Sequence, residues 1–333
     1  MAGLGRKLAE AWYRGDRWLW LLRPLEMVFR LFASLRRNAY GRGLLRAYHP
    51  GQPVVIVGNI TVGGTGKTPV VIALVEALQA RGLRPGVVSR GYGATAPDTT
   101  YPLQVSENST AALCGDEPLL IQRRTGVPVV VAPRRPMAVQ ALVEHAEVDL
   151  VLSDDGLQHY PLARDLEIVI IDAERGLGNG FCLPAGPLRE PSSRLNAVDR
   201  VLYRNGSDEK TAVRYQPRAW VNVLTGEERP LDSFASTRGV DAIAGIGQPE
   251  QFFATVRALG IESNTQAYPD HYAFTAADFD SHGGRTILMT EKDAVKCASI
   301  AGADAWYLRV DAQLPADLVE QVADLAAAGR ASH

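Results

Sequence analysis

The residues from 61 to 68 have the types and the spacing that could bind a phosphate group. Glycine lets the backbone curl until its N–H groups face phosphate oxygens, and three glycines lie just before a lysine and a threonine in the string TVGGTGKT. In a phosphate-binding loop of this kind, the lysine reaches the β- and γ-phosphates of a nucleotide and the hydroxyl residue helps to hold Mg²⁺. The predicted nucleotide-binding residues are Thr61, Val62, Gly63, Gly64, Thr65, Gly66, Lys67 and Thr68, with a catalytic role for Lys67 and a metal-binding role for Thr68.

The loop departs from the standard pattern at its first position. That pattern is G-x-x-x-x-G-K-[ST], whereas Thr61 stands where its first glycine would be. Residues 53–57 read PVVIV, which suits a buried parallel strand, and residues 67–80 have a composition that favours a helix. A glycine loop before a helix can be a simple turn, but strand, loop and helix together are the context that a phosphate site requires. We therefore predict a phosphate site, in which Thr61 is tolerable if its backbone takes an extended conformation.

Two adjacent aspartates are the first candidates to hold Mg²⁺ beside that nucleotide. Asp154 and Asp155 directly follow a predicted strand at 148–153, and ligands of open α/β sheets bind at the carboxyl ends of the strands. The string Asp-Asp-Gly could instead form a turn, but a phosphate site creates a need for a carboxylate here. We expect one aspartate to contact Mg²⁺ directly and the other through water, with Asp155 as the first choice for the direct contact.

For several other charged residues, the sequence by itself allows either a structural role or a role in the site. Asp116 and Glu117, in the string GDEP, could complement the dipole of a helix that starts there. A lone histidine is usually structural and an arginine is usually solvated, although a guanidinium group matches a phosphate in geometry. The string TEKDAVK favours a helix start capped by Thr290. The candidates for binding phosphate or substrate are Arg90, Arg134, Arg135, Arg189 and His159.

Strands that alternate with helices must position these residues. Helices are predicted at 67–80, 116–123 and 136–147, among strands predicted at 53–57, 85–89, 127–132, 148–153, 167–172 and 200–203. This rhythm indicates a mostly parallel α/β sheet of the P-loop type with helices on both faces. A polar stretch from Arg204 to Arg218 suggests a domain boundary. We predict a P-loop core at 51–212 and a smaller α/β domain at 213–333.

The string GIGQPEQFF at 245–253 looks like the turn of a second strand–turn–helix unit, because it follows the strand-like string DAIA. Glu250 occupies the third glycine position of the dinucleotide pattern G-x-G-x-x-G. We therefore assign no dinucleotide to this turn.

The first 50 residues form a basic, amphipathic segment. They carry a net charge of +7, which leaves −9 for the rest of a chain whose total charge is −2. Such a segment could lie in a membrane interface or pack on its own domain with its arginines in water. Its longest uncharged apolar run near the start, Trp18 to Leu22, is too short for a membrane span or a secretory signal. At helical spacing, one face of this segment carries Leu21, Leu25, Val28, Phe32 and Leu35. The opposite face carries Arg23, Arg30 and Arg37.

Composition and one loop position narrow the class of protein. A net charge of −2 argues against wholesale nucleic-acid binding. The three cysteines are far apart, which argues against a disulfide framework or a zinc site and fits a reducing compartment. A switch ATPase of the deviant Walker type would have a lysine at the position of Val62. A small-molecule kinase remains, and it needs an acceptor site and a group that orients a hydroxyl.

Nine strings in the chain resemble the tetraacyldisaccharide 4'-kinase family, the lipid A 4'-kinases of Gram-negative bacteria. They keep the family's order from the P-loop nearly to the C-terminus, and the loop with a hydroxyl residue at Thr61 is similar to the family's version. The strings are VGNITVGGTGKTP (57–69), SRGYG (89–93), GDEP (115–118), APRR (132–135), SDDGLQHY (153–160), LPAGPLREP (183–191), GIGQPEQFF (245–253), PDHYAF (269–274) and TEKDAVK (290–296).

The resemblance implies transfer of the γ-phosphate of ATP, with Mg²⁺, to the 4'-hydroxyl of a tetraacyldisaccharide 1-phosphate, which forms lipid IV-A. It also implies two α/β domains with the active site in the cleft between them. The segment 1–50 would dock the enzyme on the cytoplasmic face of the bacterial inner membrane, with no nucleic acid and no obligate protein partner. The alternative is a membrane-associated switch ATPase or GTPase without lipid kinase activity.

The resemblance further implies three residue roles. Asp116 acts on the acceptor hydroxyl, Glu117 belongs to the Mg²⁺ shell, and His271 pairs with Asp116. A carboxylate–imidazole pair makes chemical sense here because it can hold and orient a hydroxyl proton. The resemblance also leaves a role in the cleft open for Glu291, Lys292 and Asp293, which the residues alone favour as a helix start.

Overall fold

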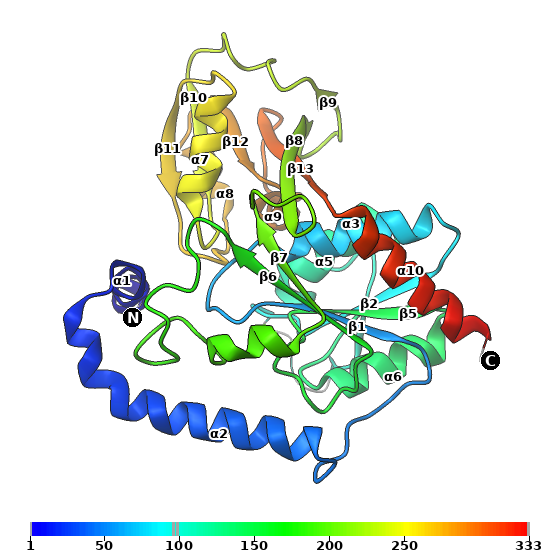
Figure 1. Cartoon of the computed structure of the whole chain (residues 1–333). Coiled ribbons are helices and arrows are strands. Elements are labelled where there is room, and N and C mark those ends of the chain that lie inside the picture. Colours follow the sequence, from blue (N-terminus) through cyan, green and yellow to red (C-terminus); the bar gives the residue numbers. More distant parts are fainter. Residues whose placement is uncertain (1, 95–96, 98–99, 332–333) are drawn as a thin grey trace.

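A path of hydrogen-bonded strands runs through the whole molecule in the computed structural model, which describes residues 2–94, 97 and 100–331. The sheet has 13 strands in the order β11-β10-β12-β13-β8-β7-β6-β1-β5-β2-β4-β3, with β9 paired to β8. Figure 1 shows two bodies that meet along this path. We call β1 to β7 the first half and β8 to β13 the second half. The mostly parallel α/β fold predicted from the sequence is confirmed.

The first half is built from short apolar strands that need cover on both faces. Its parallel strands pair along β7, β6, β1, β5, β2 and β4, while β3 is antiparallel to β4. Every residue of β1, β2, β4, β5 and β6 is buried, as expected of parallel strands covered by helices. The strands are β1 (Val54–Gly58), β2 (Pro85–Ser89), β3 (Leu103–Val105), β4 (Val129–Val131), β5 (Leu150–Asp154), β6 (Leu166–Asp172) and β7 (Arg200–Arg204).

Helices cover the first half on both sides. The apolar residues of α3 (Lys67–Gln79), α5 (Asp116–Thr125) and the C-terminal α10 (Ala316–Ala331) join one core cluster with the strands. Those of α6 (Arg135–His145) join a second cluster on the other face. A short helix, α4 (Ala111–Cys114), precedes α5. The predicted helices and strands of this half agree with the observed ones to within about three residues at their ends.

The second half shares one long strand with the first. β8 (Ala212–Asn222) begins parallel to β7 and continues antiparallel to β13, so it belongs to both halves. The predicted boundary at 212/213 therefore coincides with the start of a strand that joins the halves. The other elements are β9 (Glu228–Arg229), β10 (Val240–Ala244), α7 (Pro249–Ala258), β11 (Ser263–Ala267), α8 (Ala276–Asp280), β12 (Thr286–Thr290), α9 (Glu291–Cys297) and β13 (Ala305–Gln313).

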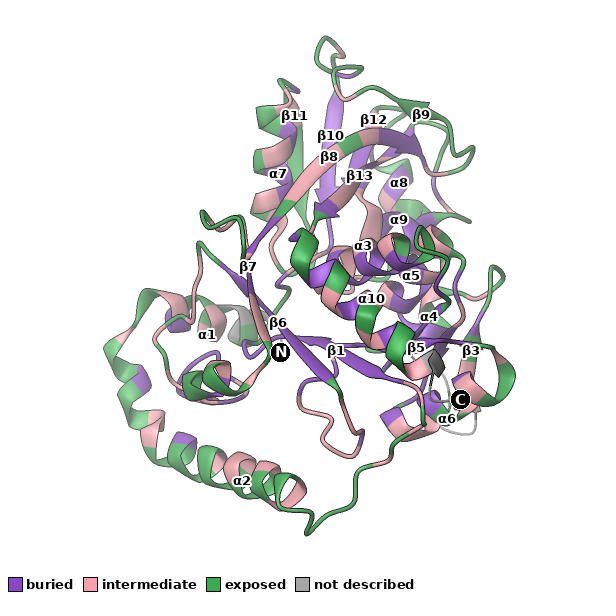
Figure 2. Ribbon diagram, turned by 45° about the vertical axis from the view of Figure 1, so that its right-hand side comes forward, coloured by how far each residue is buried: buried purple, intermediate pink, exposed green. Residues whose placement is uncertain are grey.

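The N-terminal segment runs along the outside of the first half (Figure 1). It consists of α1 (Ala2–Arg14), a 3₁₀ helix η1 (Arg17–Leu22) and α2 (Arg23–Gly41). Much of α2 is exposed (Figure 2), although Glu26 is buried and accepts a hydrogen bond from the Cys182 N–H. Within the described ranges, no helix is long and apolar enough to cross a membrane.

Candidate functional site

The glycine loop joins β1 to α3, as the sequence predicts. Gly63 and Gly66 have φ values of 105° and 81°, the left-handed region in which only glycine is unstrained. Thr61 instead forms an antiparallel β-bridge with Leu188, and the neighbouring Val62 N–H donates to the Pro187 carbonyl. The position of Thr61 is therefore extended, and a β-branched residue suits it as well as glycine would.

Lys67, Asp155 and Arg189 meet beside this loop. The Lys67 Nζ lies 3.4 Å from Asp155 Oδ1, and the Arg189 Nη1 lies 3.1 Å from Asp155 Oδ2. Asp155 follows β5 with φ of 48°, an uncommon value outside glycine. Because β1 and β5 are parallel neighbours with Val57 opposite Asp154, their carboxyl ends bring the loop and the aspartates together.

The two adjacent aspartates have opposite electrostatic environments. Burial and, next, the charge of Glu117 raise the pKa of Asp154 to about 7, although Lys67 opposes the shift. Burial also acts to raise the pKa of Asp155, but the charges of Lys67 and Arg189 outweigh it and hold that pKa well below its ordinary value. Asp155 is therefore a stable anion, whereas Asp154 titrates near neutral pH.

Asp154 also has an unsatisfied atom. Its side chain is 2% exposed, and its Oδ1 has no hydrogen-bond partner among the residues that the structure describes. A buried carboxylate oxygen without a partner is costly, and hard carboxylate oxygens are the ligands that Mg²⁺ prefers. The residues here thus fit a magnesium ion, with Asp154 offering the free oxygen and Asp155 already held in ion pairs.

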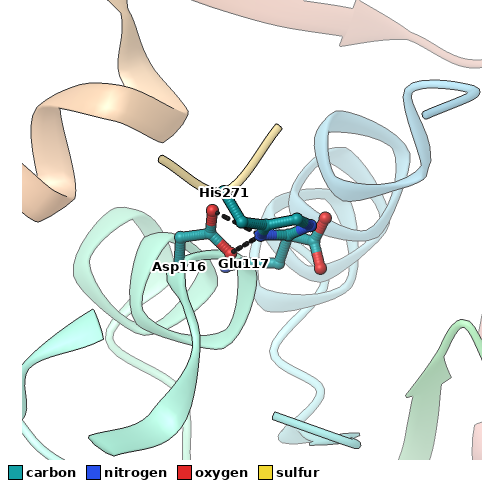
Figure 3. A group of neighbouring side chains, drawn as sticks. All are labelled: Asp116, Glu117 and His271. Carbon is teal, nitrogen blue, oxygen red and sulfur yellow. Dashed lines mark hydrogen bonds and ion pairs between the residues drawn. The ribbon is translucent and has the colours of Figure 1, made fainter. Parts of the chain in front are cut away.

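Asp116 and His271 come together from different halves of the molecule (Figure 3). The His271 Nδ1 lies 3.0 and 3.1 Å from the two carboxylate oxygens of Asp116. Asp116 is 3% exposed at the start of α5, and His271, with φ of 58°, lies in the loop after β11. Uncommon backbone angles at a polar site are a feature of functional positions.

The pair stabilises the charge of both members. Burial alone would raise the pKa of Asp116, but the hydrogen bond to His271 and the charge of Lys292 lower it. Burial alone would lower the pKa of His271, but the hydrogen bond to Asp116 raises it. The aspartate is thus kept ionised, which suits a group that accepts or orients a hydroxyl proton.

Lys292 contacts the carboxylates of the candidate site, whereas the residues alone favoured a helix start and only the resemblance left a role in the cleft open. Its Nζ lies 2.9 Å from Glu117 Oε1, 3.5 Å from Asp270 Oδ1 and 3.8 Å from Asp116 Oδ2. Burial opposes its charge, but these carboxylates raise its pKa. The helix cap predicted in the same string is also present, because Thr290 Oγ1 accepts a hydrogen bond from the Asp293 N–H. One string therefore serves both the fold and the site.

A second group of carboxylate and imidazole ligands overlaps this pair. Asp116, Glu117 and His271 each offer a ligand atom, and these atoms lie within 4.8 Å of one another. Because Glu117 also raises the pKa of Asp154, the groups beside the glycine loop and the Asp116–His271 pair are within electrostatic reach of each other.

The arginine candidates differ in how far they are buried. Arg135 is fully buried, and it donates to the Asp154 carbonyl at 2.6 Å and to Ser153 Oγ at 3.3 Å, so it supports the end of β5. Arg134, the residue before α6, and Arg90, which follows β2, are exposed. Burial and the charges of Arg135, Arg90 and then Arg36 lower the pKa of His159 to about 4. His159 therefore lies in a strongly positive region and is neutral at pH 7.

Comparisons with known proteins relate the chain to one family. A family model described as tetraacyldisaccharide-1-P 4'-kinase (LpxK) matches residues 18–327. The chain is 54% identical over 310 residues to the tetraacyldisaccharide 4'-kinase of Pseudomonas aeruginosa (strain LESB58), which covers 92% of each protein. It is 53% identical over 312 residues to the protein of the same name from Azotobacter vinelandii (strain DJ / ATCC BAA-1303), which covers 93% of each.

A solved structure is also similar. The crystal structure of the "apo" form of LpxK from Aquifex aeolicus in complex with ATP matches with a TM-score of 0.78 and 28% sequence identity. The match covers 93% of this chain and 99% of that one.

Proposed function

The chain belongs to the tetraacyldisaccharide-1-P 4'-kinase family, and from this membership we infer that it transfers the γ-phosphate of ATP to the 4'-hydroxyl of a tetraacyldisaccharide 1-phosphate. The resemblance stated from the nine strings is confirmed. The product is lipid IV-A, an intermediate of lipid A biosynthesis. The observation that carries this function is that the phosphate-binding loop lies beside the segment that holds the Asp116–His271 pair: a Cβ on Gly247 would lie 3.5 Å from the Gly64 nitrogen and 3.2 Å from Oδ2 of Asp270, the residue before His271. Nothing in the comparisons supports the switch ATPase alternative.

The nucleotide side follows from the loop. We propose that the backbone N–H groups of residues 61–68 face the phosphates, with Lys67 balancing the charge on the β- and γ-phosphates. Thr68, Glu117 and Asp154 would hold Mg²⁺, which neutralises charge on the bridging phosphate oxygens when it is bound. Asp154 is preferred over Asp155 for the direct contact, because its Oδ1 is buried without a partner whereas Asp155 is already paired with Lys67 and Arg189.

The Asp116–His271 pair, which joins the two halves, would bind the hydroxyl that accepts the phosphate. In our proposal the 4'-hydroxyl gives its proton to the Asp116–His271 pair as the oxygen attacks the γ-phosphorus and the bond to ADP breaks. Lys292 keeps Asp116 ionised, since its charge lowers the pKa of that carboxyl. In phosphoryl transfer, positioning and charge neutralisation contribute most, so the pair mainly orients the hydroxyl.

Four candidates are proposed to contact phosphate groups: three arginines through their charge, and His159, which is neutral at pH 7, through hydrogen bonding. Arg189 is beside Asp155 and Lys67, close to the transferred group. Arg90 and His159 share a positive region with Arg36 of α2, which suits the 1-phosphate of the substrate. Arg134 is exposed before α6 and is the weakest of the four.

The domain arrangement is part of the same proposal. Residues 51–212 form the P-loop core, which α10 from the C-terminal part also covers, and the rest of residues 213–333 closes the active-site cleft. Support comes from the Asp116–His271 and Glu117–Lys292 contacts, which both join these two parts.

A direct assay tests the function. Purified enzyme, Mg²⁺, ATP labelled at the γ-phosphate and the disaccharide 1-phosphate are incubated in detergent. We expect label at the 4' position, and about 10²- to 10³-fold slower labelling with Lys67→Ala. ATP hydrolysis that continues without label in the lipid would instead identify a switch ATPase.

We further propose that the N-terminal segment binds the cytoplasmic face of the bacterial inner membrane. Many large apolar side chains of this segment are exposed to solvent. They include Trp20, Leu21, Leu25, Leu31, Phe32 and Leu35, whose side chains are 55–81% exposed. A cluster of exposed apolar residues flanked by arginines favours a membrane interface over water. Anionic lipid would attract those arginines by about 1 kcal/mol each.

Vesicle binding tests the membrane proposal. The triple variant Leu25→Gln, Phe32→Gln and Leu35→Gln removes apolar contacts and leaves the charge unchanged. We expect it to bind anionic vesicles at least about tenfold more weakly than the wild type. Leu224→Gln, at an exposed leucine in the second half, is the matched control. Equal sedimentation of the triple variant and the wild type would reject this segment as the anchor.

A further inference from the structure

Three side chains donate hydrogen bonds to backbone carbonyl groups of the glycine loop. Asn59 Nδ2 donates to the Gly63 carbonyl at 3.3 Å, within the loop itself. Gln248 Nε2 donates to the Gly64 carbonyl at 2.7 Å. The Tyr215 hydroxyl donates to the Gly66 carbonyl at 2.6 Å. Gln248 and Tyr215 are far from the loop in sequence and belong to the second half and to the shared strand β8.

These bonds determine where the loop's N–H groups point. A trans peptide is planar, and its C=O and N–H point in opposite directions. The carbonyl of Gly64 shares a peptide with the N–H of Thr65, and the carbonyl of Gly66 shares one with the N–H of Lys67. Because Gln248 fixes the direction of the Gly64 carbonyl and Tyr215 that of the Gly66 carbonyl, each following N–H points away from the donor of its own peptide. Glycine peptides rotate easily, so without a donor they could turn either way.

Tyr215 is itself firmly placed. The guanidinium of Arg204 lies 4.9 Å from the centre of its ring, and Arg204 is 3.7 Å from Asp172. Asp172 in turn accepts a hydrogen bond from Gln251 on α7. A Cβ on Gly66 would lie 2.8 Å from the Tyr215 hydroxyl oxygen. Glycine is therefore needed at 66 both for its φ and for the approach of Tyr215.

The hydrogen bond from Gln248 indicates what the GIGQPEQFF turn contributes, since the sequence assigned no dinucleotide to this turn. The turn precedes α7, and a Cβ on Gly247 would lie 3.5 Å from the backbone nitrogen of Gly64. The second half thus contacts the loop through one amide side chain and brings the Gly247 backbone close to it.

We propose that Gln248 and Tyr215 are positioning residues for ATP: they hold the Gly64 and Gly66 carbonyls away from the nucleotide and so turn the Thr65 and Lys67 N–H groups toward its phosphates. This inference rests on the proposed use of ATP, and it makes the second half a part of nucleotide binding as well as of the acceptor site. Each side chain acts through the loop and touches no reacting atom.

Direct ATP binding tests the inference without the lipid. Calorimetry on the full-length protein in detergent with Mg²⁺ and ATP gives Kd for wild type, Tyr215→Phe and Gln248→Leu. Each variant removes one donor and keeps most of the side-chain volume. We expect each Kd to rise about three- to tenfold, since a neutral hydrogen bond is worth up to about tenfold in an equilibrium constant. KM for ATP should rise in parallel, while KM for the lipid stays constant.

Two control variants each lose one side-chain hydrogen bond elsewhere by the same substitutions. Tyr268→Phe removes a hydroxyl that accepts from Gln266, and Gln216→Leu removes an amide that donates to Gln313. Wild-type ATP affinity in the controls, with melting temperatures like those of the test variants, supports the proposal.

Unchanged Kd in both Tyr215→Phe and Gln248→Leu would overturn it, as would an equal loss in the controls. Weaker ATP binding by the two variants in an enzyme that fails to phosphorylate the lipid would support this inference while rejecting the proposed acceptor. If the wild type bound no ATP, both proposals would fall.

Discussion

Lys67, Asp154 and Asp155 lie at the ends of adjacent parallel strands in the first half, whereas the Asp116–His271 pair joins the two halves. The first group is placed by the pairing of β1 with β5, where Val57 lies opposite Asp154. The second exists only when the loop after β11 packs against the start of α5. The nucleotide side is therefore placed by the register of one sheet, and the acceptor side by the packing of two units.

This difference has a consequence for catalysis. The Asp116–His271 contact depends on how the two halves pack against each other, so the groups proposed to act on the hydroxyl depend on that packing too. The contacts of Gln248 and Tyr215 with the glycine loop extend the same dependence to ATP. Variants on each side should separate binding from turnover.

The largest effect is expected on the nucleotide side. Lys67→Ala removes the charge that faces the β- and γ-phosphates, and it should lower kcat by about 10²- to 10³-fold and weaken ATP binding as well. Lys210→Ala, at an exposed lysine, is the control. Steady-state kinetics and calorimetry provide the two readouts. Loss of turnover with unaltered ATP affinity would contradict the assignment of Lys67 to the phosphates.

On the acceptor side, turnover and ATP binding should separate. Asp116→Asn keeps the shape of the side chain but removes its charge, and it should lower kcat by about 10²-fold with little change in Kd for ATP. Adding His271→Ala should cause little further loss, because the two residues act as a unit.

Asp270→Asn is the matched control for that experiment. Asp270 also lies near Lys292 and His271 but is outside the pair. If it reduced turnover as much as Asp116→Asn, local charge rather than the pair would explain the loss.

The last effect expected is on the stability of the fold and not on activity, and it compares two neighbouring residues. The pKa of Asp154 is raised from 3.8 to about 7, so the folded protein holds a proton there between these values that the unfolded chain has lost. Charging Asp154 thus destabilises the metal-free fold fully above pH 7 and not at all below pH 4. Asp154→Asn should raise stability at pH 8 by at most about 4 kcal/mol, and the gain should vanish at pH 4.

Asp155→Asn should do the opposite. Lys67 and Arg189 hold the pKa of Asp155 below its ordinary value, so its charge stabilises the fold above pH 4, and that stability is lost as pH falls through the lowered pKa. Thermal melts of both variants at pH 8 and pH 4, without Mg²⁺, measure the difference. Shifts of the same sign at pH 8 would show that the two carboxylates do not differ as described.

Much of the first half could be read from the sequence because its signals are local. Runs of β-branched residues predicted the buried strands, and the helix beginning at Lys67 was predicted to within one residue of its end. The glycine loop could be recognised because the φ values of Gly63 and Gly66 depend on the residue type itself. The cap at Thr290 is local in the same way.

Contacts between segments that are far apart in the chain could not be predicted from the sequence. Lys292 looked like part of a helix start, and its approach to Glu117 joins residues 175 positions apart. Arg134 and Arg135 looked equivalent, yet one is exposed and the other is fully buried beneath β5. No local pattern distinguishes these cases, since burial depends on what the rest of the chain places beside a residue.

By itself, the sequence determined the phosphate loop, the run of strands and helices, and the basic amphipathic N-terminus, because backbone preference and side-chain periodicity act over a few residues. Only the tertiary structure decided which aspartate has a free oxygen, that Lys292 enters the site, and that Gln248 and Tyr215 hold the loop. The reason is that pKa shifts and hydrogen bonds between distant segments depend on distance in space, which the packing of the two halves sets.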